Sequence, residues 1–327
     1  MSNSAWGTLS DQAVAFAGVV YFLALLAHLV EWSALRQVAT PATVTAGSGE
    51  VLVAERPGPT AASSSRAELF GRLGVLLTAG AAFVHFIALL GRGMAADPNR
   101  VPWGNMYEFT LSGTFVVAVL YLALYRKLAL HWMAPIVVAF VLTLLMVAVI
   151  WLYGPVAPLT EALNSPWLVI HVVSAVIATG AFTIGGIASV LYLVKSKHPD
   201  AGGYLARVPE PPALDRIAYR LHSFAFPVWT FAVLITGPIW AHQAWSSFWN
   251  WDPKEVWAFI TWVVYAGYLH ARATAGWRGR RAAWLALVGM ATLWFNFIGI
   301  NYFSTTSQHS YAGLEAPRVP GPAQTSR

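Results

Sequence analysis

A series of long apolar stretches, nearly free of charged residues, limits the fold of this chain more than any other feature. A helix needs about 20 apolar residues to cross the hydrocarbon core of a bilayer. Backbone N–H and C=O groups find no water there, so such stretches span the membrane as helices. We therefore predict an all-α fold, a polytopic transmembrane helix bundle. The eight candidate spans are residues 12–35, 68–91, 106–125, 132–153, 167–194, 222–243, 255–272 and 282–302.

The composition agrees with this setting. Of the 327 residues, 57% are hydrophobic and 10% are charged, whereas about 25% of residues are charged in a soluble globular domain. The first stretch is too long, and its front too uncharged, for a typical cleaved signal peptide. We expect it to remain in the protein as a span.

Lysine and arginine are distributed unevenly between the two sides of the predicted bundle. Fifteen of the 20 lie in the loops after the first, third, fifth and seventh stretches. Cytoplasmic loops collect these residues, so we expect both termini and the loop after the sixth stretch on the outer, periplasmic side of the cell membrane. The net charge of +6 follows from this topology and is poor evidence for nucleic-acid binding.

Composition also divides the chain into segments. Residues 1–37 hold the first span, and residues 38–67, rich in Ala, Thr, Ser, Gly and Pro, predict a flexible cytoplasmic linker. Residues 68–311 form the main membrane domain, and residues 312–327, with three prolines, predict a disordered tail.

Residues 240–262, here called the Trp-rich segment, contain six of the sixteen tryptophans. Tryptophans gather at bilayer surfaces, where an apolar ring lies beside wet headgroups, but such a belt needs only one or two at each helix end. A wall of indole rings suits a large, flat, apolar ligand such as a porphyrin. The residues expected to form this wall are Trp240, Trp245, Trp249, Trp251 and Trp257.

A short polar sequence interrupts the Trp-rich segment. Asp252, Pro253 and Glu255 match the start of a helix, with Asp as N-cap, Pro at the first position and Glu at the third. A rigid helix start would fix the angle at which the tryptophans meet a ligand. Lys254 could pair with a haem propionate.

Five histidines lie in or beside the predicted spans: His28, His85, His171, His270 and His309. An ionisable residue in a span is a functional hypothesis, and neutral imidazole is a usual axial ligand of haem iron. Each one alone is more often a hydrogen-bonded helix contact, but their combination with the Trp-rich segment favours haem.

The other histidines have ordinary expected roles. His131, His198 and His222 are predicted to be solvated or to lie at helix ends, and His242 could line the Trp-rich segment.

The expected depth of the five histidines separates them into two groups. His171 and His309 lie near the outer surface and can flank the Trp-rich segment. His270 comes fifteen residues after Glu255, roughly 20 Å deeper at the rise of an α-helix, so it implies a second site. His28 has a comparable inner depth, and His85 lies nearer the outer half.

The core WNWDPKEVWAFITW resembles the WWD domain of a family of haem-handling membrane proteins that includes CcsA, also called ResC or CcsB, and more distantly CcmF. The resemblance covers roughly residues 70–311, with departures at His242 and at residues 246–248. Further matching segments follow in the family's order: PWGNMYEF at 102–109, LDRIAYRLHSFAF at 214–226, YLHAR at 268–272 and HSY at 309–311.

The resemblance implies cytochrome c biogenesis by the so-called System II. It implies that His171 and His309 are outer axial ligands of haem b, that the WWD segment holds the ring, and that His270 ligates a transmembrane haem. A ResB-like membrane partner would supply the counterpart of His270, or His28 or His85 would. The reaction is addition of the two thiols of a CxxCH motif in apocytochrome c to the haem vinyl groups, in the manner of a haem lyase.

The chain has no cysteine, so every thiol in such a reaction must come from a partner, which leaves room for a thioredoxin-like thiol reductant. Three alternatives stay open: a haem exporter or chaperone that forms no bonds, a respiratory subunit that holds haem permanently, and a solute carrier. A permanent haem site predicts paired histidines at equal depth, and a carrier predicts inverted repeats.

Overall fold

The computed structural model describes residues 1–36, 61–156, 165–304 and 306–308, and helices are the regular elements of this described part. The elements follow in the order α1 (Asn3–Arg36), α2 (Ala61–Met94), α3 (Met106–Tyr125), η1 (Leu130–Met133), α4 (Ala134–Val147), η2 (Ala148–Leu152), α5 (Pro166–Lys197), α6 (Pro211–Thr230), η4 (Phe231–Thr236), α7 (Gly237–Trp245), α8 (Pro253–Ala273), α9 (Arg280–Trp294), η5 (Phe295–Gly299) and α10 (Ile300–Phe303). η2, η4 and η5 are π-helical turns that continue α4, α6 and α9.

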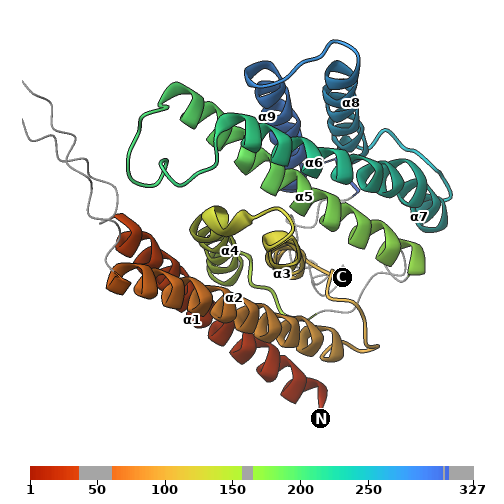
Figure 1. Ribbon diagram of the computed structural model, residues 1–327. Coiled ribbons are helices and arrows are strands. Elements are labelled where there is room, and N and C mark those ends of the chain that lie inside the picture. Colours follow the sequence, from red (N-terminus) through yellow and green to blue (C-terminus); the bar gives the residue numbers. More distant parts are fainter. Residues whose placement is uncertain (37–60, 157–164, 305, 309–327) are drawn as a thin grey trace, which may run out of the picture.

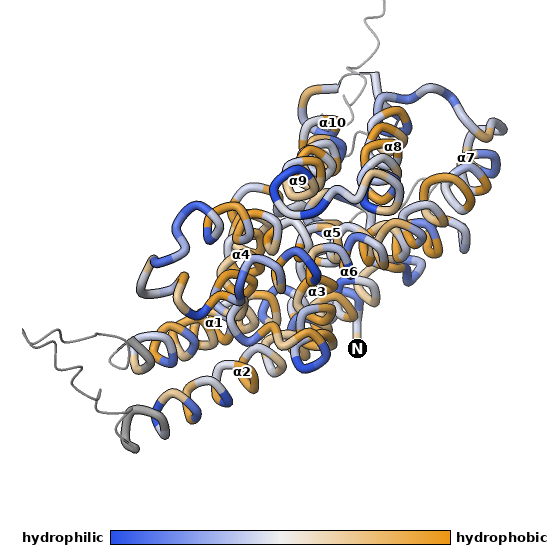
Figure 2. The backbone as a smooth tube through the Cα atoms, turned by 45° about the horizontal axis from the view of Figure 1, so that its top comes forward, coloured by the Kyte–Doolittle hydropathy of each residue, from blue (hydrophilic) through white to orange (hydrophobic). Residues whose placement is uncertain are grey.

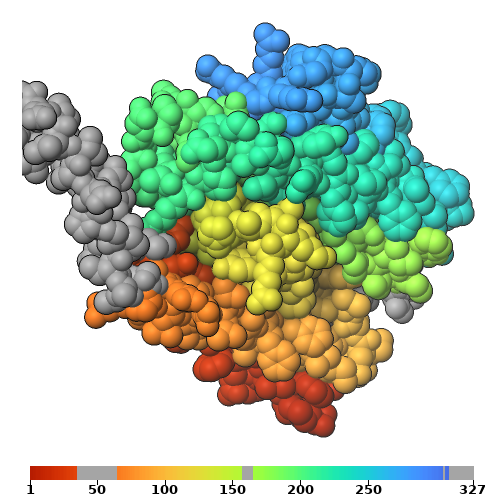
Figure 3. Space-filling view, viewed as in Figure 1, coloured from red at the N-terminus to blue at the C-terminus, as the bar shows by residue number. Residues whose placement is uncertain are grey.

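The helices pack in pairs. α1 lies against α2, α3 and α4 fill the middle of the molecule, and α5 pairs with α6 (Figure 1). α8 and α9 form the last pair and contact α6 and α5, respectively. In the space-filling view, α3 and α4 occupy the space between the α1–α2 pair and the α5–α6 pair (Figure 3). We call the end of the bundle that carries the Trp-rich segment the Trp end.

Seven of the eight predicted spans correspond to helices long and apolar enough to cross a membrane, counted over the described ranges. Hydrophobic residues follow these helices, while hydrophilic residues gather at their ends and in the loops (Figure 2). The eighth prediction, 255–272, coincides with α8, which does not meet the same criterion. The reason is composition, because α8 has Lys254 and Glu255 in its first turn and His270 and Arg272 in its last.

Three helices begin well before the predicted spans. α1 begins at Asn3, whereas its span was predicted from residue 12. α2 begins at Ala61, within the predicted linker 38–67, because its early alanines favour helix. α6 begins at Pro211, more than two turns before the predicted start at 222, with prolines in the first turn where no N–H partner is needed. The rest of the predicted linker, the tail and residues 309–311 lie outside the described residues.

A buried ionic cluster joins α2 to the start of α3 at the Trp end. The carboxylate of Glu108, fully buried, accepts from Arg92 Nε at 2.9 Å and Arg100 Nη1 at 2.7 Å. It also accepts from the backbone N–H of Gly104 at 2.6 Å. Asn105 caps the same helix by accepting from the N–H of Glu108. These bonds fix the first turn of α3, which lines the cavity described next.

Candidate functional site

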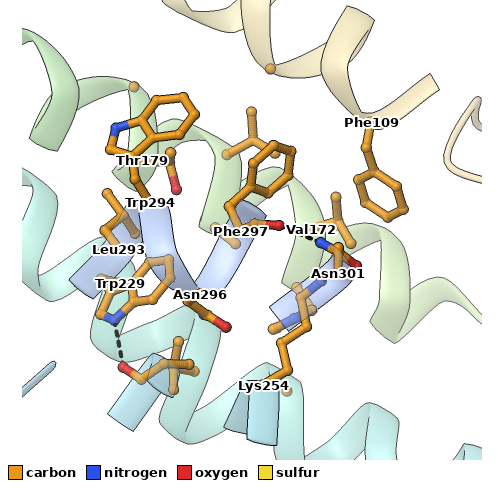
Figure 4. A pocket seen from close by; sticks show the side chains of 18 of the residues that line it. Phe109, Val172, Thr179, Trp229, Lys254, Leu293, Trp294, Asn296, Phe297 and Asn301 are labelled. Carbon is orange, nitrogen blue, oxygen red and sulfur yellow. Dashed lines mark hydrogen bonds between the residues drawn. The ribbon is translucent and has the colours of Figure 1, made fainter. Parts of the chain in front are cut away.

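An apolar cavity lies at the Trp end between α3, α5, α7, the first turn of α8 and the turn η5. The space open to the centres of water molecules is about 210 Å³. On α5 its lining runs from Leu168 to Thr183, roughly 22 Å along the helix. Figure 4 shows Phe109, Phe297 and Trp294 around the hollow. The cavity thus reaches from the Trp-rich segment deep into the bundle.

The predicted helix start in the Trp-rich segment is confirmed. Asp252 is the N-cap of α8, and its Oδ1 accepts from the N–H of Lys254 at 2.8 Å. Glu255 closes the capping box by accepting from the N–H of Asp252 at 3.2 Å, and it also accepts from Asn250 at 2.9 Å. Pro253 occupies the first helical position. The carboxylate of Glu255, in the first turn of α8, therefore holds the loop that precedes the helix.

The loop between α7 and α8 contains two non-glycine residues in the left-handed region. Ser246 ends α7 at φ 56°, and Trp251 has φ 56° directly before the N-cap. Such values are uncommon for residues with a Cβ and occur where surrounding structure enforces them, often at functional sites. The ring of Trp251 is 77% exposed and meets the ring of Trp249 edge to face at 5.9 Å. Trp249 lines the cavity.

The predicted tryptophan wall forms only in part. Trp240 is buried and lines the cavity together with Trp249, whereas Trp245 packs behind Trp240 with ring centroids 4.8 Å apart. Trp257 packs on Phe295 at 4.3 Å instead of lining the hollow. Two tryptophans outside the Trp-rich segment line it as well: Trp229 of α6 and Trp294 of α9. Their only signal in the sequence was an indole within an apolar span.

His171 of α5 lines the cavity as the sequence predicted for an outer site. Its ring is nearly parallel to that of Trp240, with an interplanar angle of 14° and centroids 6.0 Å apart. Its Nδ1 donates to the carbonyl oxygen of Ala232 at 2.9 Å, since a carbonyl can only accept. The tautomer with Nδ1–H leaves the lone pair on Nε2, the form that ligates a metal. Ala232 belongs to the π-helical turn η4, a feature frequent at functional sites.

The chain after α10 returns to the start of α8. Asp252 accepts from Ser307 Oγ at 2.8 Å and from the backbone N–H of Gln308 at 2.6 Å. Its carboxylate therefore caps α8 and holds the segment that precedes His309. His309 itself lies outside the described residues.

Lys254 lines the cavity from the first turn of α8, at the Trp end and outside the seven spans. Its Nζ donates to Asn301 Oδ1 at 3.1 Å. Burial lowers the pKa of Lys254 to about 8, and the charge of Asp252 opposes this shift. The lysine faces the cavity because the helix start turns it inward.

His270 lies in the last turn of α8, far from the cavity, and its side chain is exposed on the surface of this chain. His28 of α1 and His85 of α2 are fully buried. His28 Nδ1 lies 3.2 Å from Glu31 Oε2. His85 packs edge to face against Tyr21 and Phe115. The structure thus brings one predicted ligand to the cavity and leaves these three at other places.

His222 is where the sequence interpretation was wrong. It was expected at a solvated helix end, but α6 begins at Pro211, so His222 falls within the helix and is fully buried. Its ring packs against Tyr265 at 5.3 Å and Tyr268 at 5.1 Å. The sequence did contain a signal for this burial, because an amphipathic stretch typical of a helix precedes His222. His131 and His198 are exposed as predicted. His242, expected to line the Trp-rich segment, is exposed and stacks on Phe248 of the same segment at 4.2 Å.

The residues around this cavity fit a large, flat ligand with a metal centre and acidic groups. Aromatic and aliphatic side chains form most of the wall, one imidazole is oriented for ligation, and one lysine lies at the edge. Ligand sites commonly combine an apolar lining with a few placed polar groups.

Three comparisons place the chain among known proteins. Residues 103–307 match the family model described as Cytochrome C assembly protein. The chain is 31% identical over 273 residues to the cytochrome c biogenesis protein CcsA of Mesostigma viride, covering 75% of this chain and 86% of that one. It is 34% identical over 209 residues to CcsA of Gloeobacter violaceus, covering 48% and 61%. The chain thus spans less than two thirds of that second relative.

A solved structure of the cytochrome c haem lyase CcmF has a similar fold. The TM-score is 0.60 at 15% sequence identity, and the match covers 90% of this chain and 46% of that chain. At this identity the likeness concerns the fold alone. With more than half of its residues matching the family model and relatives above 30% identity, the chain is a multi-pass membrane protein that belongs to the cytochrome c assembly protein family.

Proposed function

We propose that this chain binds haem b at the Trp end and promotes its covalent attachment to the CxxCH motif of apocytochrome c. The observation that carries the proposal is the position of His171. Its ring lies in the wall of an apolar cavity, is held by the carbonyl of Ala232, and lies nearly parallel to Trp240. The relatives named as cytochrome c biogenesis proteins support a role in the same process.

His171 and His309 are the proposed axial ligands of this haem. His171 would approach the iron from α5 with Nε2. His309 follows Gln308, whose backbone is bonded to Asp252 beside the cavity. Two imidazoles would keep the iron bound while the ring edge stays available to a second protein.

The proposed reaction is an addition that needs no external electrons. The S–H bond of each cysteine thiol breaks, sulfur bonds to the inner carbon of a vinyl group, and the proton ends on the terminal carbon. Two such additions give two thioether bonds. Since the chain has no cysteine, both thiols come from the apocytochrome, and a thioredoxin-like reductant would keep them reduced. Positioning the thiols against the vinyl groups supplies most of the acceleration.

His270 is proposed as the ligand of a second, transmembrane haem. Its exposure on α8 favours a counterpart from outside this chain, namely a ResB-like membrane partner. His28 and His85 are the less favoured alternatives, because both are buried within the α1–α2 region. We further propose that the Trp end faces the periplasm across the cell membrane, with both termini on that side, as the distribution of Lys and Arg suggests.

The second candidate function is haem export or chaperoning without bond formation. It uses the same cavity and the same histidines, so it differs from the first only in the fate of the vinyl groups. The test is reconstitution of the full chain with its ResB-like partner, haem and a reduced apocytochrome.

Thioether formation is measured as haem that stays on the apocytochrome in a denaturing gel. A shift of the reduced pyridine haemochrome band to shorter wavelength reports the saturated vinyl groups. We expect attachment with the wild type and with His131→Ala, an exposed control, and strong loss with His171→Ala. An AxxAH apocytochrome must give none. Haem that binds but never becomes covalent would favour the exporter or chaperone.

A further inference from the structure

Three polar side chains from the last third of the chain line the largely apolar cavity. Lys254 comes from α8, Asn296 from η5, and Asn301 from α10. We call them the polar strip. Lys254 Nζ donates to Asn301 Oδ1 at 3.1 Å, and Asn301 Nδ2 donates to the carbonyl of Phe297. Figure 4 shows the side chains of Lys254 and Asn301 approaching each other beside the hollow.

The backbone places the two asparagines on the same side. They are five residues apart, a spacing that would separate them around an α-helix. The intervening turn η5, Phe295–Gly299, is π-helical, and a turn with i→i+5 bonds brings residues five apart nearly into line. π-helical turns are rare and are frequent at functional sites. The alignment of Asn296 and Asn301 by such a turn therefore indicates a functional role.

Asn296 has an unused hydrogen-bonding group. Its side chain is 6% exposed, lines the cavity, and its Oδ1 has no hydrogen-bond partner within the described chain. Amide O and N are interchangeable by rotation, so the same group can present N–H donors. Buried polar atoms without partners are costly and indicate a missing ligand or water.

The acidic residues beside the polar strip are already engaged. Glu255 accepts from the backbone N–H groups of Asn250 and Asp252. Asp252 accepts from Lys254 N, from Ser307 Oγ and from Gln308 N. These donors stabilise the two carboxylates where they are. The ammonium of Lys254 donates to the neutral amide of Asn301, so this edge of the cavity combines a positive charge with amide groups.

Apolar and hydroxyl side chains of α3 and α5 form another part of the cavity lining. Met106 and Phe109 come from α3, and Leu168 and Val172 from α5. Haem has its two carboxylates on one edge and its two vinyl groups on the opposite side of the ring. A strip with an ammonium and two amide groups therefore distinguishes the carboxylate edge from the vinyl edge.

We propose that Lys254, Asn301 and Asn296 bind the propionate carboxylates of haem and thereby turn its vinyl edge away from the polar strip. This inference rests on the proposed haem binding and adds to it a fixed orientation of the ring. Hydrogen bonds to a carboxylate are stronger than those between neutral groups, so a correctly held carboxylate edge would dominate the choice between ring orientations.

The test compares iron protoporphyrin IX with its dimethyl ester, which keeps the ring, iron and vinyl groups but lacks the carboxylate charges. Both are titrated into the haem-free full chain in detergent and followed by absorption and tryptophan fluorescence. We expect the wild type to prefer the diacid by about tenfold or more, the factor equivalent to one charged hydrogen bond. Lys254→Met and Asn301→Leu should bring the preference close to one while the ester binds as before.

Two further variants separate recognition from folding. Asn301→Asp keeps the size of the side chain and should weaken the diacid but not the ester. Lys197→Met removes an exposed lysine in the last turn of α5 and should leave the preference unchanged. If the wild type binds both compounds equally, or the strip variants lose both equally, the orientation proposal is overturned while haem binding stands. If neither compound binds the wild type, the proposed function itself fails.

Discussion

The Nδ1 atom of His171 donates to the carbonyl oxygen of Ala232 at 2.9 Å, joining α5 to the π-helical turn η4. The same oxygen accepts from Thr236 Oγ1 at 3.1 Å and from the backbone N–H of Gly237. The π-helical turn η4 thus holds the imidazole of His171 through one carbonyl oxygen. The orientation of His171 depends on this turn as much as on its own helix.

Gly237 gives the first prediction, because a Cβ there would lie 3.2 Å from His171 Cε1 and 3.1 Å from Ala232 O. Gly237→Ala should displace the imidazole and weaken haem binding several-fold, with a changed visible spectrum. Gly267→Ala is the matched control, since a Cβ at Gly267 meets nothing within 4 Å. Equal spectra and affinities for the two variants would contradict the proposed role of the turn.

The second prediction concerns Asp252, which caps α8 and holds Ser307 and Gln308. Asp252→Asn keeps a good N-cap, but an amide nitrogen in place of Oδ2 cannot accept from the backbone N–H of Gln308. We expect α8 to stay stable while haem dissociates faster, and added imidazole to slow that release. Asp97→Asn makes the same change on an exposed loop residue. Haem should dissociate from this control variant at the wild-type rate. A fall in thermal stability with an unchanged dissociation rate would assign Asp252 to capping alone.

The third prediction tests the ionic cluster at the start of α3. Glu108→Gln leaves the buried guanidinium groups of Arg92 and Arg100 without their common carboxylate. Breaking a buried ion pair costs about 3–5 kcal/mol, so thermal unfolding in detergent should shift clearly downward. Glu68→Gln removes an exposed pair with Arg72 and should change stability by less than about 1 kcal/mol. Equally small shifts of the unfolding temperature in the two variants would show that the fold does not depend on the ionic cluster.

The fourth prediction is a pH dependence of haem binding. Burial lowers the pKa of Lys254 to about 8, so the lysine loses its charge in the empty protein as the pH rises through that value. Affinity for the diacid should therefore fall above pH 8, because binding an anion favours the protonated lysine. The dimethyl ester should show no such fall. Lys254→Arg keeps its charge in this range and should bind the diacid with a flat profile.

Most of the fold could be predicted from the sequence, because length and hydropathy alone decide which stretches cross a bilayer. The start of α8 was equally accessible, since Asp252, Pro253 and Glu255 act through local bonds. The start of α6 was not, because its polar first turns pack against other helices and conceal a buried His222.

Only part of the candidate site could be predicted. His171 was found through its depth and its position beside the Trp-rich segment. Asn296 and Asn301 were missed, because the π-helical turn that aligns them has no signature in the sequence. Trp229 and Trp294 were missed because which face of a span meets a cavity depends on tertiary packing.

The most direct test of the account is the visible spectrum of the chain, purified with haem in detergent, alone and with a ResB-like partner. The wild type should show a bis-imidazole haem spectrum. His171→Ala and His309→Ala should weaken it and recover it with added imidazole, while His270→Ala should affect a separate haem. Wild-type protein without haem under haem-replete conditions, or a spectrum unchanged in all three variants, would contradict the central claim.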